Sequence, residues 1–144
     1  MKILVDADAC PVKDEIIKVA KEFEIKVIML IDTSHILYDD YAEIITVDKG
    51  KDSVDMALVN RIENKDIVVT QDYGVATIAL SKRAYVINQN GLIFTNENID
   101  SLLFEREMAR KSRQTGRTCS KHKKRKKSDD ERFESIFRKL CRDA

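Results

Sequence analysis

The sequence predicts a three-layer α/β/α sandwich with a mainly parallel sheet. Short runs of Ile, Leu and Val recur up to Phe94 without the alternation of polar and apolar positions that a half-exposed strand shows. Such runs are typical of strands that are buried on both faces of a parallel sheet. Stretches with helical spacing separate them, which is the order of an α/β protein. A length of 144 residues corresponds to one domain.

Each element of this body is expected from its apolar spacing and its flanking residues. The first strand is Ile3-Leu4-Val5 and ends at Asp6, and Pro11 then opens a helix at a position where its missing N–H costs nothing. Asn90-Gly91 is a turn signal that joins a terminal hairpin. Further strands are expected over residues 25–31, 44–47, 67–70, 85–87 and 92–94, and helices over residues 11–23, 52–63 and 75–82.

The C-terminal part of the chain differs in composition from this body. Asn96 can cap a helix that runs to about Lys111, and residues 113–127 then contain eight basic residues and no acid. Ser128-x-x-Glu131 reads as a capping box ahead of apolar residues at helical spacing, namely Phe133, Ile136, Phe137, Leu140 and Cys141. We therefore expect an α/β domain over residues 1–112, a basic linker over 113–127 and an amphipathic helix over 128–144.

Composition and charge narrow the functional classes. The apolar runs are far shorter than the roughly 18 residues that a membrane span needs, and three cysteines at irregular spacing argue against a disulfide framework. A cytoplasmic protein without membrane contact is expected. Residues 1–104 contain 11 Lys and Arg but 18 Asp and Glu, whereas residues 105–144 contain 15 and 7. An acidic body with a basic tail points to a nucleic-acid partner for the tail.

Acidic residues follow or end several of the expected strands. Asp6 and Asp8 close the first strand and Asp72 follows the strand over residues 67–70, while Asp52 and Asp55 share one face of a helix. Ligands bind at the carboxyl ends of parallel strands, so all five acids could converge there. Gathered carboxylates raise one another's pKa values, and a divalent cation such as Mg²⁺ or Mn²⁺ relieves the repulsion.

A structural role is the alternative for each acid taken alone. Asp and Asn often follow strands because they cap helices and hold turns. Asp8 could cap the helix at Pro11, Asp52 its own helix, and Asp72 could hold a turn. Asp32 also ends a strand, where a solvated edge position is expected.

Several motifs together resemble one family. Val5-Asp6-Ala7-Asp8-Ala9-Cys10-Pro11 looks like the signature of the YaiI/YqxD family of bacterial proteins, and further blocks keep the family's order over about residues 1–116. These blocks are Gly50-Lys51-Asp52-Ser53-Val54-Asp55, Val69-Thr70-Gln71-Asp72, Asn88-Gln89-Asn90-Gly91 and Phe94-Thr95-Asn96-Glu97-Asn98-Ile99. The segment after Lys111 departs more from the family pattern.

The resemblance implies a fold and an activity. The family is similar to PIN-like nucleases, in which acids at strand ends bind Mg²⁺ or Mn²⁺ and cleave RNA. Carried over by position, it places Asp6, Asp8, Asp52, Asp55 and Asp72 at a metal-binding and catalytic edge.

Basic residues are the candidates for holding a nucleic-acid backbone. Each phosphate contact by Lys or Arg adds a salt-dependent term to the affinity. The alternative for the dense tail is a solvated, disordered linker. The candidates are Lys82, Arg83, Arg113, Arg117, Lys121, Lys123, Lys124, Arg125, Lys126 and Lys127.

The thiols and rings have simpler interpretations. Cys10 at a helix start could be a nucleophile, but without a linked histidine a packed thiol is favoured. Cys119-x-x-His122 with Cys141 lacks a fourth zinc ligand, so Cys141 is expected to pack on the last helix. Tyr73 could stack on a base.

Three functions fit these observations. The first is a divalent-metal-dependent nuclease acting on RNA. The second is a non-catalytic RNA-binding module that uses the tail, in which removal of residues 112–144 abolishes binding and leaves the body folded. The third is a metal-dependent phosphatase of the haloacid dehalogenase type, because a strand followed by Asp-x-Asp also opens that motif.

Overall fold

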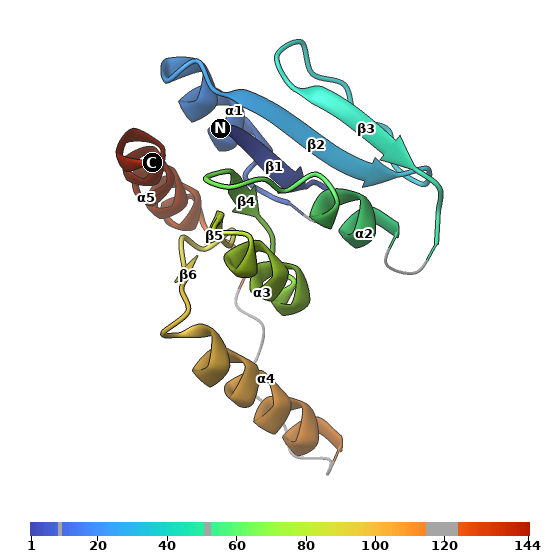
Figure 1. Cartoon of the computed structure of the whole chain (residues 1–144), viewed down its shortest axis with the longest axis vertical. Coiled ribbons are helices and arrows are strands. Elements are labelled where there is room, and N and C mark those ends of the chain that lie inside the picture. Colours follow the sequence, from blue (N-terminus) through green and yellow to red (C-terminus); the bar gives the residue numbers. More distant parts are fainter. Residues whose placement is uncertain (9, 51–52, 115–123) are drawn as a thin grey trace.

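The computed structural model describes residues 1–8, 10–50, 53–114 and 124–144. Strands and helices follow one another much as the apolar spacing predicts (Figure 1). The strands are β1 (Lys2–Asp6), β2 (Lys26–Asp32), β3 (Glu43–Val47), β4 (Ile67–Val69), β5 (Tyr85–Ile87) and β6 (Ile93–Phe94). The helices are α1 (Lys13–Glu22), α2 (Ser53–Val59), α3 (Tyr73–Ser81), α4 (Ile99–Gln114) and α5 (Lys127–Asp143).

The six strands form one mainly parallel sheet in the order β3-β2-β1-β4-β5-β6. The first five in this order run parallel, and β6 pairs with β5 in an antiparallel hairpin. Chain order reverses between β1 and β4, which leaves a crevice beyond the carboxyl ends of these two strands. The architecture is consistent with a PIN-like three-layer sandwich, and the predicted fold class is confirmed.

Helices cover both faces of the sheet (Figure 1), and one cluster of buried apolar side chains lies on each face. Ile3 and Val5 of β1 pack among residues of α1 and α5, whereas Leu4 between them packs among residues of α2 and α3. This alternation follows from the strand geometry, in which successive side chains point to opposite faces. Because both faces are covered, the central strands are apolar throughout.

The two C-terminal helices have different environments. The α5 side chains of Phe133, Phe137 and Cys141 are buried beside α1, and Arg138 of α5 donates two hydrogen bonds to Glu22 at 2.7 and 2.8 Å. In contrast, α4 projects from the body, and Ile99 is its buried residue (Figure 1). Within the described ranges, none of the helices combines the length and apolarity needed to cross a bilayer.

Several helices begin or end at other residues than predicted, and other residues make the hydrogen bonds at their ends. Helix α1 begins at Lys13, so Pro11 lies in the preceding turn, and α2 ends at Val59, whose carbonyl accepts a hydrogen bond from Lys82 Nζ at 2.9 Å. Ahead of α4, Thr95 and Asn98 exchange hydrogen bonds, so the contacts expected of Asn96 come from its neighbours.

The start of α5 also differs from the predicted capping box. The side chain of Asp129 accepts from the backbone N–H of Lys126 at 2.8 Å, and the helix begins at Lys127. Ser128 therefore lies inside the first turn, and the Ser128–Glu131 box is wrong. Of the expected linker, residues 113–114 belong to α4 and Lys127 to α5, and the described residues 124–126 lie outside both helices.

Candidate functional site

Asp6 lies at the crevice between β1 and β4. It is the last residue of β1, and β1 and β4 are neighbours in the sheet. Burial is the largest cause that raises the pKa of Asp6, and together with the negative charges of Asp55, Asp8 and Asp72 it brings the value to about 6. Four of the five predicted acids therefore share one electrostatic environment, as the strand-end rule predicts. Asp52 lies outside the described residues.

Asp72 and Asp55 approach this point from the start of two helices. Asp72 is the N-cap of α3, where its Oδ1 accepts a hydrogen bond from the Val75 N–H at 2.9 Å. The Asp72 N–H donates to the hydroxyl of buried Thr70 at 3.0 Å. Asp55 lies in the first turn of α2. The capping role considered for Asp72 is thus present together with its place beside Asp6.

Two adjoining cavities surround these acids. The first, of about 340 Å³, is bordered by Asp6 and Asp72 and also by Cys10, Val69, Thr70, Gln71, Gln89 and Arg106. The second, of about 370 Å³, lies between α2 and α3 and is bordered by Asp55, Asp72 and Ile78. Asp72 borders both, so the two cavities meet at its side chain. A ligand in this groove would face carboxylates from three elements.

A hydrated cation does not require closely spaced acids. Among the described residues, Asp6, Asp55 and Asp72 do not bring one oxygen each within 4.8 Å of one another. Mg²⁺ keeps several of its waters and is commonly held by one or two carboxylates, so direct contact with all three acids is not required. The oxygen-only donor set fits Mg²⁺ or Mn²⁺.

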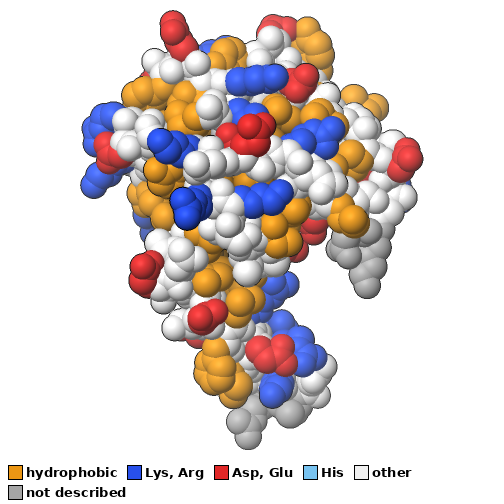
Figure 2. Space-filling view, in the orientation of Figure 1, with side chains coloured by type: hydrophobic (Ala, Val, Ile, Leu, Met, Phe, Trp, Pro, Cys, Tyr) orange, Lys and Arg blue, Asp and Glu red, His pale blue; other side chains and the backbone are white. Residues whose placement is uncertain are grey.

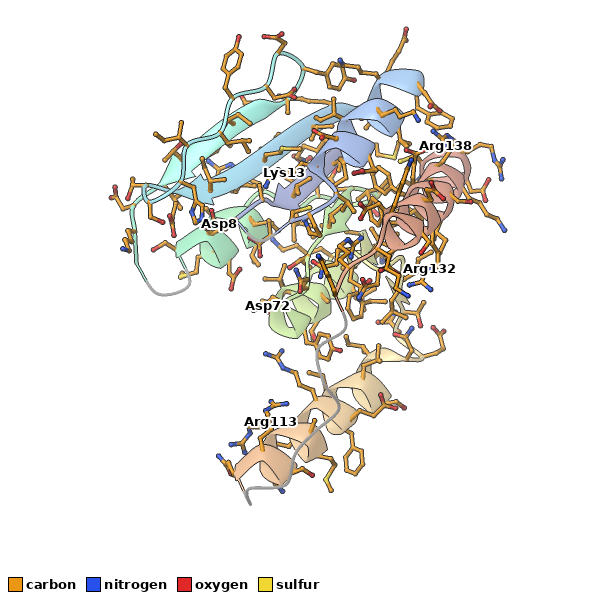
Figure 3. All side chains as sticks on the ribbon, turned by 180° about the vertical axis from the view of Figure 1, so that it is seen from behind. Asp8, Lys13, Asp72, Arg113, Arg132 and Arg138 are labelled. Atoms are coloured by element: carbon orange, nitrogen blue, oxygen red, sulfur yellow. The ribbon has the colours of Figure 1, made fainter. Side chains whose placement is uncertain are left out.

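Asp8 contacts the end of β2. Its Oδ1 accepts from the Asp32 N–H at 3.2 Å and lies 3.1 Å from the Nδ1 of His35. It does not cap α1, whose N-cap is Val12. The Asp32 side chain is 22% exposed and accepts from the Ser34 N–H at 2.8 Å, so Asp32 is partly solvated, as expected, and also contacts protein groups. Asp8 and Asp72 lie toward the same edge of the sheet (Figure 3).

The described basic residues of the tail border a third cavity. This cavity of about 570 Å³ is lined by Lys124, Arg125, Lys126 and Arg132, and it shares Gln89 with the cavity beside Asp6. Arg125 also has structural contacts, because it donates to the Gln89 carbonyl at 2.8 Å and to Asn90 Oδ1 at 2.9 Å. Lys127 is the first residue of α5. Arg117, Lys121 and Lys123 lie outside the described residues.

The basic residues Lys82 and Arg83 lie at the opposite end of α3 from Asp72. Asp72 precedes α3, whereas Lys82 follows its last turn and Arg83 precedes β5. Lys82 and Arg83 therefore lie at the opposite edge of the sheet, and the expectation that they hold a backbone beside the acids is corrected. Arg113 lies near the far end of the projecting α4 (Figure 3).

Sequence reasoning missed Arg106 and Gln89. Arg106 of α4 borders the cavity beside Asp6, and its guanidinium lies 5.1 Å from the ring centroid of Tyr73. The Tyr73 ring also meets Phe94 edge to face at 5.5 Å, so Tyr73 packs between protein groups. Neither residue type nor spacing marks Arg106, because its place depends on how α4 leaves the sheet.

The described thiols are packed as predicted. Cys10 is 7% exposed and borders the cavity, and burial raises its pKa. Cys141 is buried on α5, and burial raises its pKa to about 12. The remaining members of the zinc alternative, Cys119 and His122, lie outside the described residues.

The fold and the strand-end acids define the class of protein: an α/β protein of PIN-like architecture with an acidic groove at the switch point of its sheet. The model of the YaiI/YqxD family, described as an uncharacterized BCR, matches residues 4–143, and the chain belongs to this family. No solved structure matches the chain.

Curated relatives of the chain share the name UPF0178 protein. The protein from Ruminiclostridium cellulolyticum is 59% identical over 95% of this chain and 90% of its own length. That from Lachnoclostridium phytofermentans is 54% identical over 99% and 97%, respectively. These matches cover the C-terminal part of the chain as well as the body. The family name carries no assigned activity.

Proposed function

We propose that this protein is a divalent-metal-dependent nuclease that hydrolyses phosphodiester bonds in RNA. The single observation that carries the proposal is the environment of Asp6, a half-buried carboxylate at the sheet's switch point next to three other acids. Concentrated negative charge of this kind costs folding free energy, and a bound cation offsets the cost. Mg²⁺ or Mn²⁺ is the proposed cofactor.

The proposed roles follow from where the side chains lie. Asp6, Asp55 and Asp72 would hold the ion, with Asp8 and Asp52 as the further acids of the set. When bound, such an ion supplies Lewis-acid chemistry that activates water and steadies charge on a phosphate. Arg106 is placed at the wall of the same cavity, where its cation would attract the phosphate.

RNA is the proposed substrate because an acidic groove adjoins a basic one. The cavity with Lys124, Lys126 and Arg132 meets the acidic cavity at Gln89. An RNA strand bound by the basic residues of this cavity would extend past Gln89 and reach the acids. Phosphate contacts of this type position a strand without reading its bases.

The test is cleavage of a mixed-sequence, fluorescently labelled single-stranded RNA in Mg²⁺ or Mn²⁺. We expect Asp6→Asn and Asp72→Asn each to lower the rate by about 100-fold or more, since each removes a charge that holds the ion. Asn is as good an N-cap as Asp, so Asp72→Asn keeps the start of α3 intact. Asp40→Asn, in an exposed loop, is the matched control and should cleave at the wild-type rate.

Other results would contradict the nuclease. Salt-dependent RNA binding without metal-dependent cleavage would favour the non-catalytic RNA-binding module. Turnover of a generic phosphomonoester without RNA cleavage would favour the phosphatase. Equal cleavage by wild type and Asp6→Asn would show that the activity arises elsewhere.

A further inference from the structure

A second group of metal-ligating atoms lies beside the acids, at the end of β2. Asp8 follows β1, Asp32 is the last residue of β2, and His35 lies three residues further along the chain. The pairing of β1 with β2 sets Asp6 opposite Leu30, so two residues further on Asp8 lies level with Asp32. The sheet register itself brings the two carboxylates together.

The three ligand atoms face one another at short range. His35 Nδ1 lies 3.1 Å from Asp8 Oδ1 and 3.2 Å from Asp32 Oδ1, and all three atoms lie within 4.8 Å of one another. Ligand bonds of about 2.1 Å separate neighbouring ligand atoms by about 3.0 Å at a right angle and about 3.4 Å at a tetrahedral angle. The two distances from His35 Nδ1 lie between these values, as distances between neighbouring ligands of one ion do.

The ligand types of Asp8, Asp32 and His35 and the exposure of their side chains also fit a cation site. Asp8 Oδ1 accepts from the Asp32 N–H, and Asp32 Oδ1 accepts from the N–H and the hydroxyl of Ser34; a cation would take the position between these two oxygens and the Nδ1 of His35. The His35 side chain is 49% exposed and those of Asp8 and Asp32 are each 22% exposed. Solvent can therefore complete the coordination. Among the described residues, this is the group of three that meets the 4.8 Å spacing.

We propose that Asp8, Asp32 and His35 form a second divalent-cation site, selective for first-row transition metals over Mg²⁺. The imidazole nitrogen sets the selectivity, because Mg²⁺ prefers oxygen ligands and transition metals accept nitrogen. Asp32 and His35 are new assignments, and Asp8 is shared with the acidic groove. The proposal does not depend on RNA cleavage.

Pulsed electron paramagnetic resonance with Mn²⁺ tests this site directly. Mn²⁺ bound to the full chain should show hyperfine coupling to an imidazole nitrogen. His35→Asn should remove the coupling and weaken Mn²⁺ binding at this site by about tenfold or more. The chain has two histidines, so His122→Asn is the matched control and should keep both the coupling and the affinity.

Further variants keep the test decisive. Asp32→Asn should lower the Mn²⁺ affinity although the imidazole remains. Because the substituted side chains are partly exposed, the variants should fold, and circular dichroism checks this. Asp6→Asn should keep the nitrogen coupling while it loses RNA cleavage, which separates this site from the proposed nuclease. Absence of nitrogen coupling in the wild type, coupling that persists in His35→Asn, or equal affinity for Mg²⁺ and Mn²⁺ would each overturn the proposal.

Discussion

At the scale of single residues, the half-buried carboxyl of Asp6 makes the stability of the fold depend on pH. Its pKa is raised from 3.8 to about 6, first by burial and then by Asp55, Asp8 and Asp72. Between these two pH values the folded chain holds a proton that the unfolded chain has released. Stability from this group is therefore present below about pH 4 and declines as the pH rises through 6.

We predict that Asp6→Asn flattens this part of the pH dependence. In chelator, the variant should exceed the wild type in free energy of unfolding by about 1–2 kcal/mol at pH 7, and the gain should shrink towards pH 4. Urea denaturation at several pH values measures the difference between the two proteins. A variant that is less stable than the wild type at pH 7 would contradict this account of Asp6.

The position of Asp8 shows where residue-level reasoning from sequence ends. Strand-end placement predicted correctly that Asp8 lies near Asp6. Its contacts with Asp32 and His35 depend on the register of β1 with β2 and on the backbone after Asp32, and neither is encoded in a local pattern. The same holds for Arg106, whose place is set by the direction of α4.

At the scale of elements, the sequence predicted the helix α5 but not the surface against which it packs. Apolar spacing indicated the amphipathic helix correctly, but it does not say which surface the helix covers. Phe133 and Phe137 stack with ring centroids 5.2 Å apart and are buried in the same core as α1. Because removal of α5 would expose this core, we expect the body to lose stability without residues 112–144, in contrast to the prediction made from the sequence.

A buried and an exposed phenylalanine test the contribution of α5. Phe137→Ala should lower the free energy of unfolding by about 3–5 kcal/mol, because it leaves a cavity in the core. Phe104→Ala on the projecting α4, where the side chain is 66% exposed, should change it by less than about 0.5 kcal/mol. Urea denaturation checks both, and similar losses for the two variants would contradict the packing of α5. Figure 2 shows hydrophobic side chains exposed on α4.

The start of α3 separates the structural role of Asp72 from its proposed metal role. In chelator, Asp72→Ala should cost about 1 kcal/mol of stability because the hydrogen bond to the Val75 N–H is lost, whereas Asp72→Asn should keep that bond. Thermal unfolding of the two variants gives the comparison. Equal loss in both would show that the carboxylate charge, and not the cap, stabilises the helix.

At the scale of the whole molecule, the order of the strands brings the acids together. The sequence indicated which residues end strands, and parallel strands place such residues at one edge. The sequence pattern does not reveal that β1 lies between β2 and β4, or that the basic segment before α5 borders the groove at Gln89. Both depend on contacts between distant parts of the chain.

This arrangement predicts which cations govern RNA affinity. Lys124→Ala should weaken binding and reduce the slope of log affinity against log salt by about 0.7 if its phosphate contact is lost. Lys139→Ala, an exposed lysine elsewhere on α5, is the matched control and should leave the slope unchanged. Fluorescence anisotropy over a salt series measures both slopes. A larger effect of Lys139 than of Lys124 would contradict the basic groove.

The most direct measurement of the central claim is the free energy of unfolding at pH 7 with and without Mg²⁺, for the wild type and Asp6→Asn. A cation held by the acids at 100 times its dissociation constant should stabilise the wild type by about 2.7 kcal/mol. The variant should gain far less, because it lacks one of the charges that hold the ion. No gain in the wild type, or the same gain in both proteins, would contradict a metal site at this edge.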